Sequence, residues 1–442
     1  MQHISLLKKS INFINNGKIT GSDTSIDPNF FLASWGESIG FINLKNLAKQ
    51  KIPLINKFKI IFKELIAAKT HKLNIYHLPK NKKFESLVFS YFIPENLKKD
   101  GNYFDKYFAV KTKNWKKILW VFIPLKHHSQ KFKTLDNTII LNRNTKKGLV
   151  LYFLIFFKSL IIFFSNLLFN ADLTFKNQKI NFSTDFFNII NKLVKLYKIK
   201  KIIYPYEGQP HQTYLNKKIK FLYPKLKIIG YMHTAIPPLP LDYIKKECEP
   251  DILYVNGYAQ KQILIKHFGW PSKKIINIIS MRYAKSPKNK MFKKIFLPYY
   301  LEDESKFFNL FQTLIYSKPK FYFPVFKIKN HPSMEFSKTH KRLIKKINAF
   351  LKVNKNYFKN HKLNKEKSIF LGSSAAILEA LERKVQVYHI CSDVIFEKFD
   401  NFYWKDIKVE DIAQNIFKYK LLSQGKLIKL GENKNLFAKI TK

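Results

Sequence analysis

A repeated order of elements constrains the fold of this chain most: short apolar runs alternate with stretches of helical spacing. In the second half, such runs occupy 201–204, 226–231, 251–255, 275–279, 293–299, 321–329, 367–371 and 384–390. Similar runs at 30–35, 87–92 and 118–123, with helical spacing over 55–68, extend the pattern into the first half. Continuous apolar strands alternating with helices are typical of parallel sheets covered by helices. We therefore predict an α/β fold.

The length and one polar stretch predict two domains. A chain of 442 residues is too long for a single compact core. Residues 284–290 combine Lys, Ser, Pro and Asn, a composition typical of linkers. We predict one α/β domain over 1–285 and a second, Rossmann-like domain over 286–442.

The charge is extreme, but its composition argues against nucleic acid as a partner. The formal net charge is +50, from 80 basic and 30 acidic residues. Only four of the basic residues are Arg, the side chain that reads guanine edges best. Diffuse Lys charge is still sufficient to attract an anionic membrane surface, which we predict as a partner.

The two cysteines and the N-terminus predict a cytoplasmic protein. Cys248 and Cys391 lie far apart and cannot form a disulfide framework or a zinc site. The first residues lack the basic and then apolar order of a signal peptide. Together with the basic charge, these features predict a peripheral location on the inner face of the cytoplasmic membrane.

Residues 149–169 are almost wholly apolar, and the sequence leaves three placements open for them. The first is a membrane span, which the length suits, although Lys158 falls near the middle, where a charge is costly. The second is a buried core helix. The third is a helix lying in the membrane interface, next to the basic Lys146 and Lys147.

Polar residues that follow strands of the first half are candidates for catalysis. Glu207 directly follows the apolar run 201–204 and precedes Gly208. A carboxylate at the carboxyl edge of a sheet, partly desolvated, is expected to have a raised pKa and to act as a general base. His233 follows the next strand and would share proton transfer. Arg282, one of few arginines, follows the strand at 275–279 and is predicted to bind a carboxylate or phosphate.

The second half carries a predicted phosphate site, which consists of Lys329, His331, Ser373 and Ser374. Lys329 and His331 end one apolar run, and the two serines follow another and precede a helix. Hydroxyls and free backbone N–H groups at a helix start suit a nucleotide phosphate. Glu379, within that helix, is placed to accept from ribose hydroxyls. No glycine-rich phosphate loop and no metal-ligand spacing is present, so we predict neither a metal nor a cofactor.

These residues resemble known families over roughly 200–395. Glu207-Gly208, Lys329-Asn330-His331-Pro332 and Ser373-Ser374 are similar to the ordered motifs of bacterial GT-B sialyltransferases and polysialyltransferases. The last two motifs are shared with capsule Kdo transferases and CDP-glycerol glycerophosphotransferases. The run from Tyr204 to Tyr283 resembles a bacterial surface carbohydrate (O-antigen-type) biosynthesis family.

The resemblance implies a GT-B fold, with two Rossmann-type domains and a cleft between them. It implies a metal-independent glycosyltransferase that moves a sugar from a nucleotide-activated donor, for which a CMP-linked sugar is one candidate, to a glycan or lipid-linked acceptor of surface polysaccharide or lipopolysaccharide. Glu207 would be the base, while His331, Ser373 and Ser374 would hold the phosphate. Tyr206 stands in place of the first acid of the sialyltransferase pair, which leaves the sugar open. Two further functions stay open, a polyol-phosphate transferase of CDP-glycerol type and a non-catalytic, membrane-associated scaffold.

Overall fold

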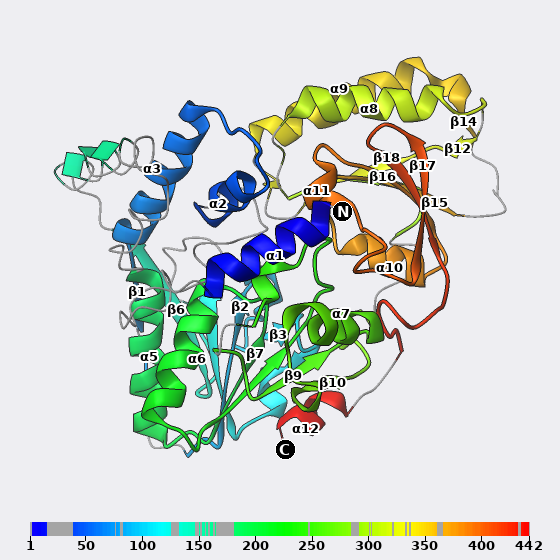
Figure 1. Ribbon diagram of the computed structural model, residues 1–442. Coiled ribbons are helices and arrows are strands. Elements are labelled where there is room, and N and C mark those ends of the chain that lie inside the picture. The colour runs from blue at the N-terminus through cyan, green and yellow to red at the C-terminus, as the bar shows by residue number, and fades with distance from the viewer. Residues whose placement is uncertain are drawn as a thin grey trace.

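The computed structural model contains two α/β domains, each built on its own sheet (Figure 1). The residues that the structure describes are 2–15, 39–75, 77–79, 83–124, 132–145, 150, 153, 154, 156, 157, 160, 161, 164, 181–245, 248–283, 291–299, 301, 303–320, 322–331, 334, 335, 337–359, 366–431 and 435–441.

The first domain contains an eight-stranded sheet with the order β1-β6-β5-β2-β7-β8-β9-β10. Only β1 is antiparallel to its neighbour. The central strands β2 and β5 are mostly apolar and almost wholly buried, as is typical of parallel strands covered on both faces. The strands are β1 (His71–Ile75), β2 (Ser86–Phe92), β5 (Ile118–Pro124), β6 (Thr138–Thr145), β7 (Lys201–Pro205), β8 (Lys227–Tyr231), β9 (Ile252–Val255) and β10 (Ile275–Asn277).

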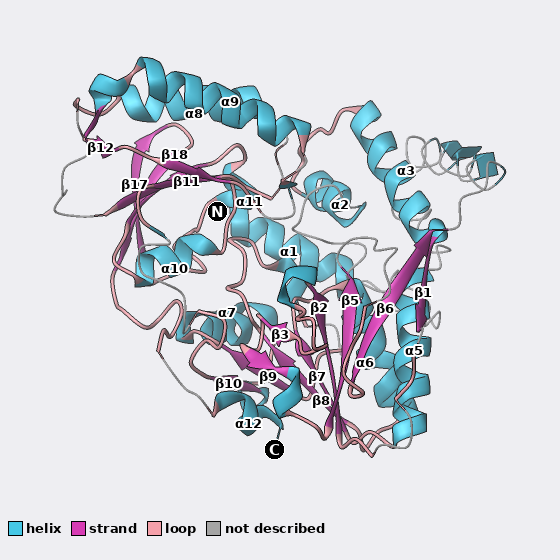
Figure 2. Ribbon diagram, turned by 180° about the vertical axis from the view of Figure 1, so that it is seen from behind, coloured by secondary structure: helices cyan, strands magenta, loops and turns pink. Residues whose placement is uncertain are grey.

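Helices cover this sheet, and a small hairpin lies at its carboxyl edge (Figures 1 and 2). The helix α6 begins with Pro at its first turn and a reciprocal capping box between Gln209 and Gln212. The hairpin consists of β3 (Phe104–Asp105) and β4 (Val110–Lys111). The helices are α2 (Ile39–Leu47), α3 (Leu54–Thr70), α5 (Asn181–Tyr197), α6 (Pro210–Leu222) and α7 (Tyr258–Phe268).

The second domain contains a six-stranded sheet with the order β13-β11-β15-β16-β18-β17. The first four strands are parallel, and the hairpin of β17 and β18 adds two antiparallel strands at one edge. A two-stranded sheet pairs β12 with β14. The strands are β11 (Lys294–Phe296), β12 (Phe323–Pro324), β13 (Lys327–Lys329), β14 (Phe358–Lys359), β15 (Lys367–Leu371), β16 (Gln386–Ile390), β17 (Ile407–Ala413) and β18 (Ile416–Leu421).

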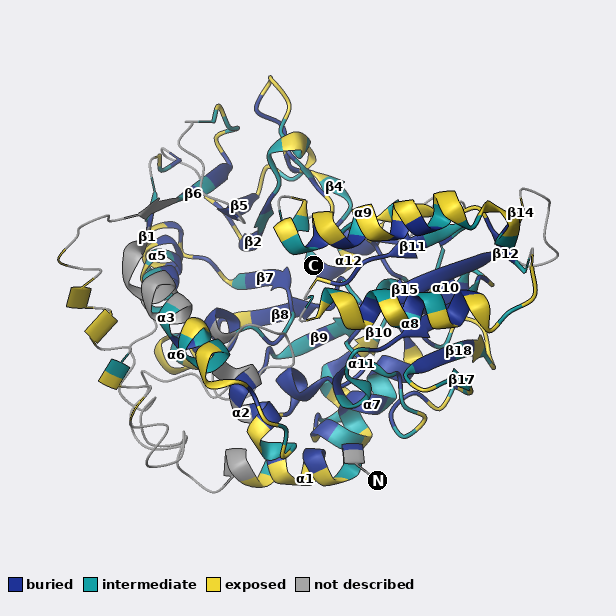
Figure 3. Cartoon of the chain, turned by 90° about the horizontal axis from the view of Figure 1, so that it is seen from above, coloured by how far each residue is buried: buried dark blue, intermediate teal, exposed yellow. Residues whose placement is uncertain are grey.

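The long helices α8 and α9 of this domain bury one face and expose the other, whereas the short α10 is buried nearly throughout (Figure 3). In α9, the buried residues recur at helical spacing: His340, Leu343, Ile347 and Phe350. The Ser337 side chain caps this helix by accepting from the backbone N–H of His340. The helices are α8 (Glu304–Tyr316), α9 (Lys338–Val353), α10 (Ala376–Glu382) and α11 (Val394–Glu397).

Both ends of the chain pack against the opposite domain. The N-terminal helix α1 (Gln2–Asn15) places His3 Nε2 2.7 Å from the Ile395 carbonyl of the second domain. The last helix, α12 (Leu436–Thr441), returns to the first domain, where the Phe437 ring packs against Trp120 and Trp115 (Figure 1). One hydrophobic core therefore includes residues from both halves.

The predicted α/β fold with two Rossmann-type domains is confirmed. The predicted boundary at 285/286 falls between the two sheets, at residues outside the described ones, and the run at 30–35 also lies outside them. The single strand predicted over 321–329 is wrong, because β12 and β13 join different sheets on either side of Val325. Pro324 has no N–H for a ladder, which explains the break.

For residues 149–169, the described side chains exclude the buried core helix. Val150 is 74% exposed and Ile161 is 69% exposed. Among the helices of the described residues, none combines the length and apolarity that a bilayer crossing needs.

Candidate functional site

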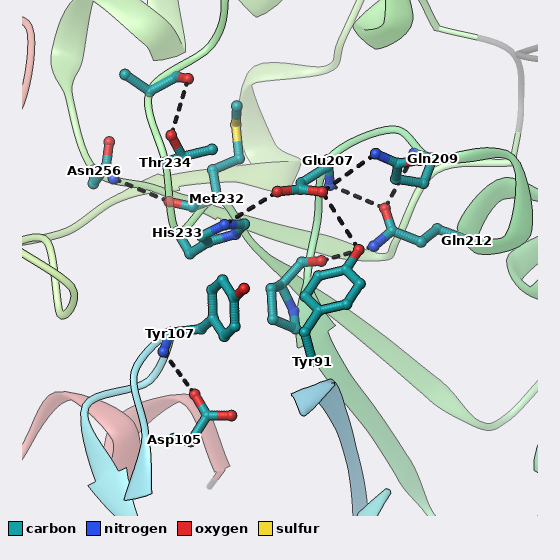
Figure 4. Close-up of polar contacts among 12 residues, drawn as sticks. Tyr91, Asp105, Tyr107, Glu207, Gln209, Gln212, Met232, His233, Thr234 and Asn256 are labelled. Carbon is teal, nitrogen blue, oxygen red and sulfur yellow. Dashed lines mark hydrogen bonds and ion pairs between the residues drawn. The ribbon is translucent and has the colours of Figure 1, made fainter. Parts of the chain in front are cut away.

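Glu207 lies at the carboxyl end of β7, and the local backbone fixes its place (Figure 4). The next residue, Gly208, has φ +67°, and a Cβ there would come within 2.8 Å of the Asp242 carbonyl oxygen. Only glycine fits this turn without strain. The backbone N–H of Glu207 donates to Gln212 Oε1 at 2.9 Å, which ties the turn to the start of α6.

The Glu207 carboxylate has three side-chain partners. Its Oε1 lies 3.1 Å from His233 Nε2, and its Oε2 accepts from Gln209 Nε2 at 3.3 Å and from the Tyr91 hydroxyl at 3.4 Å. The Glu207 side chain remains 26% exposed, whereas that of His233 is 2% exposed. A substrate can therefore reach the carboxylate but not the imidazole behind it.

His233 follows β8, and neighbouring residues hold both its ring and the backbone before it. The Tyr107 ring packs edge-on against the imidazole with centroids 4.5 Å apart (Figure 4). Asn256 Nδ2 donates to the Met232 carbonyl oxygen at 3.0 Å and so fixes the preceding backbone. Within the described part of the chain, the buried Nδ1 of His233 has no hydrogen-bond partner.

The protonation states of this pair differ from the expectation. Burial raises the pKa of Glu207, but His233, Gln209 and Arg282 together outweigh it, and the pKa is lowered. The predicted raised pKa is therefore wrong: the partners stabilise the charged form more than burial disfavours it. Burial also lowers the pKa of His233, against the opposing effect of Glu207. Both pKa shifts fit an ionised Glu207 carboxylate that accepts a hydrogen bond from the Nε2–H of a neutral His233.

Arg282 lies beside this pair and is oriented by aromatic rings. Its guanidinium is 5.8 Å from the Tyr107 ring centroid and 5.7 Å from that of Tyr283. The residue is exposed, and its charge contributes to lowering the pKa of Glu207. An arginine held against ring faces, with its N–H donors toward solvent, is suited to bind an anion.

His331 lies at the end of β13, across from Arg282. Its ring is edge-on to Tyr299 with centroids 5.2 Å apart. Burial, followed by the positive charges of His340 and Arg282, lowers the pKa of His331 to about 4. Arg282 belongs to the first domain, so its charge acts on His331 across the boundary between the domains. Lys329, two residues earlier, is exposed.

Ser373 and Ser374 follow β15 and are half-buried. Gly372 precedes them with φ +66°, and a Cβ there would lie 2.9 Å from Pro298. The Ser374 hydroxyl accepts from the Ala376 backbone N–H at 3.3 Å, an ordinary contact at the start of α10. Their role in phosphate binding stays a prediction.

Glu379 has an internal partner that sequence analysis did not anticipate. Arg383 Nε donates to its Oε1 at 3.0 Å, and both side chains are buried. The same guanidinium donates to the Tyr283 carbonyl oxygen at 3.2 Å and so connects α10 to the first domain. A ribose would have to displace this pair, so the ribose role of Glu379 stays a prediction without support from this geometry.

The structure thus brings Glu207, His233 and Arg282 into one cluster, and the charge of Arg282 also acts on His331. Sequence analysis missed Tyr107, whose loop is held because Asp105 Oδ1 accepts from the Tyr107 and Phe108 N–H groups at 2.8 Å each. In the sequence, an Asp followed by a short turn was the only local indication of this loop. Among the described residues, no group of three or more His, Cys, Asp or Glu could hold a metal ion.

Comparison of the sequence with protein families finds no match. Comparison with curated proteins finds none either.

Several solved structures share a similar chain path at low identity. UDP-GlcNAc 2-epimerase from Neisseria meningitidis, bound to UDP-GlcNAc, is 10% identical over 73% of this chain and 85% of its own, with a TM-score of 0.38. The α,α-trehalose 6-phosphate synthase of Burkholderia multivorans is 11% identical over 71% and 77%, with a TM-score of 0.36. The catalytic domain of starch synthase IV from Arabidopsis thaliana, bound to ADP and acarbose, is 10% identical over 73% and 91%, with a TM-score of 0.34. Because all three TM-scores are below 0.5, the function is inferred from this chain's own site.

Proposed function

We propose that this protein is a glycosyltransferase of surface-polysaccharide biosynthesis that uses a nucleotide-activated sugar as donor. The observation that carries the proposal is the Glu207–His233 pair at the carboxyl edge of the first sheet, with the cationic Arg282 beside it. A partly exposed carboxylate with a cation beside it, together with the polar groups of the second domain, suits transfer between a hydroxyl and a sugar phosphate.

Glu207 is the base in this mechanism, since its carboxylate is ionised and partly exposed. It takes the proton of the acceptor hydroxyl while the acceptor oxygen bonds to the anomeric carbon of the donor. The bond from that carbon to the phosphate oxygen breaks, and the electron pair stays on the phosphate. His233 acts as a positioning residue, because its Nε2–H holds the carboxylate from a buried place.

Arg282 and His331 stabilise the negative charge that develops on the departing phosphate. The guanidinium supplies a fixed positive charge, and the half-buried imidazole, with its lowered pKa, supplies a neutral N–H donor. Ser373, Ser374 and Lys329 add hydroxyl, backbone and ammonium donors from the second domain. The acceptor is a glycan or a lipid-linked glycan on the cytoplasmic side.

The first test is nucleotide binding, measured by thermal shift with CMP, CDP, UDP, GDP and dTDP. We expect one nucleotide to raise the Tm of the wild-type protein, and we expect the same nucleotide to leave the Tm of His331→Ala unchanged. His267→Ala is the matched control, because His267 is also half-buried and packs on an aromatic ring, that of Phe402 at 4.6 Å. If no nucleotide stabilises the folded wild-type protein, the transferase proposal is wrong and the scaffold becomes the better explanation.

The second test is turnover with the donor that binds. Glu207→Gln keeps the shape of the side chain but cannot take a proton, so kcat should fall by about 10²–10⁴-fold with little change in nucleotide affinity. Full activity of this variant would refute the assigned base. The mass of the product distinguishes sugar transfer from polyol-phosphate transfer, the second reaction that the same phosphate site could serve.

A further inference from the structure

An apolar surface projects from the first domain. It consists of exposed side chains on two helical segments, α3 and the described residues between 150 and 164 (the teal segment beyond α3 in Figure 1). We call it the apolar face: Leu54, Ile55, Val150, Phe153, Leu154, Phe157, Ile161 and Phe164. All eight side chains are at least half exposed, between 51% and 74%.

Six of the eight residues of this face share one side of a helix. Positions 150, 153, 154, 157, 161 and 164 recur every three or four residues, which places them on a single stripe. Phe156, which borders this stripe and is 40% exposed, packs edge-on against Phe58 and Phe62 of α3, with ring centroids 6.2 and 6.1 Å apart. The two segments therefore contact each other at the border of the stripe, and the stripe itself remains exposed to solvent.

Exposed apolar side chains elsewhere on the described surface occur singly or as the adjacent pair Phe221 and Leu222. Phe221 at the end of α6 and Val353 at the end of α9 are 83% and 82% exposed, but neither belongs to a stripe. Single exposed apolar residues are ordinary on protein surfaces, whereas a contiguous patch of this kind marks an interaction site.

The charge around the face selects the partner. Lys51 and Lys59 are exposed beside Leu54 and Ile55, and Lys57 is half-buried on the same helix. Apolar and aromatic side chains bordered by lysines are the composition of helices that lie in an anionic membrane interface. Two copies of a chain with net charge +50 repel each other, which disfavours a dimer through this face.

We propose that the apolar face inserts into the interface of an anionic lipid bilayer and holds the protein there peripherally. The phenylalanine rings and aliphatic side chains enter the acyl boundary, while the lysines of α3 remain among the headgroups. This interaction needs neither a nucleotide nor an acceptor, so its failure or success is independent of the proposed transferase activity.

The experiment is flotation of the full chain with two kinds of vesicle. One kind contains only phosphatidylcholine, and in the other about one lipid in three is the anionic phosphatidylglycerol. We expect binding to the anionic vesicles, reduced at least roughly 10-fold by the double variant Phe153→Ser/Phe157→Ser, since burial of such side chains dominates interfacial partitioning. The matched control, Phe221→Ser/Val353→Ser, removes two apolar side chains that are even more exposed, and it should bind like the wild type. Because all four positions are exposed, both variants should fold, which circular dichroism checks.

Three results would overturn the proposal. Equal vesicle binding by wild type and Phe153→Ser/Phe157→Ser would mean that lysines alone attract the membrane. Absence of binding to either vesicle would exclude the bilayer as partner. A lipid-free dimer, seen by light scattering and dissociated by the same double variant, would assign the face to a second copy instead. As an independent readout, a Phe157→Trp variant should show blue-shifted emission that brominated acyl chains quench.

Discussion

Removal of one buried carboxylate, Glu382, should loosen the connection between the two domains. Glu382 ends α10, is 6% exposed and accepts from the backbone N–H groups of Gly425, Leu427 and Ile428 at 2.6, 2.7 and 3.2 Å. The same segment pairs with the first domain, where Gln260 Nε2 donates to the Leu427 carbonyl oxygen at 2.9 Å. The carboxylate thus anchors a stretch of chain that both domains share.

The size of the effect follows from which donors lose a partner. In Glu382→Ala, the N–H of Gly425 lies at an exposed position and can bind water instead. The N–H groups of Leu427 and Ile428 belong to fully buried residues and would be left unsatisfied. At about 1–3 kcal/mol for each unsatisfied donor, the local cost is about 2–6 kcal/mol.

Hydrogen exchange measures this cost directly at the two amides. A loss of that size should make Leu427 and Ile428 exchange roughly 30- to 10⁴-fold faster, at tenfold for each 1.4 kcal/mol. The control is Glu410→Ala, which breaks an exposed ion pair with Lys418 at 2.9 Å and should cost under about 1 kcal/mol. If both amides exchange at the wild-type rate in Glu382→Ala, the carboxylate does not anchor the segment.

Three further predictions concern sterics and protonation. Gly257→Ala should lower the free energy of unfolding by about 3 kcal/mol, because the added Cβ would overlap the Leu427 carbonyl oxygen. Gly425→Ala should cost only about 1 kcal/mol, because φ is +73° there but no atom lies within 4 Å of the added Cβ. Equal urea midpoints for the two variants would contradict this. Burial lowers the pKa of His389 to about 4, whereas the pKa of an unfolded histidine is about 6.5. The neutral side chain therefore costs no stability above about pH 6.5, and the protein loses stability as the pH falls from there toward 4. A Tm that stays constant from pH 7 to 4.5 would refute this. His233→Asn removes the main partner that lowers the pKa of Glu207 while burial remains, so the acid limb of the kcat/KM profile should move to higher pH; an unmoved limb would show that His233 does not influence the base.

Much of the site could be predicted because its residues follow strands directly. The runs before Glu207 and His233 are mostly apolar and short, and local periodicity identifies such strands. Side chains after parallel strands must then lie at the carboxyl edge, whatever the rest of the chain does. The pair of Glu379 and Arg383 also had a local signal, since residues four apart on a helix are neighbours.

The sequence by itself therefore determined the alternation of elements, the two-domain α/β fold and the polar residues at the strand ends. Tertiary structure alone decided how these residues interact. Tyr107 reaches His233 from a hairpin more than a hundred positions earlier in the chain, and Phe437 returns from the last helix to Trp120. The lowered pKa of Glu207 likewise depends on Arg282, which approaches from another strand. Local patterns encode backbone propensity and burial, whereas contacts between distant segments depend on how whole layers pack, which no short stretch of sequence specifies.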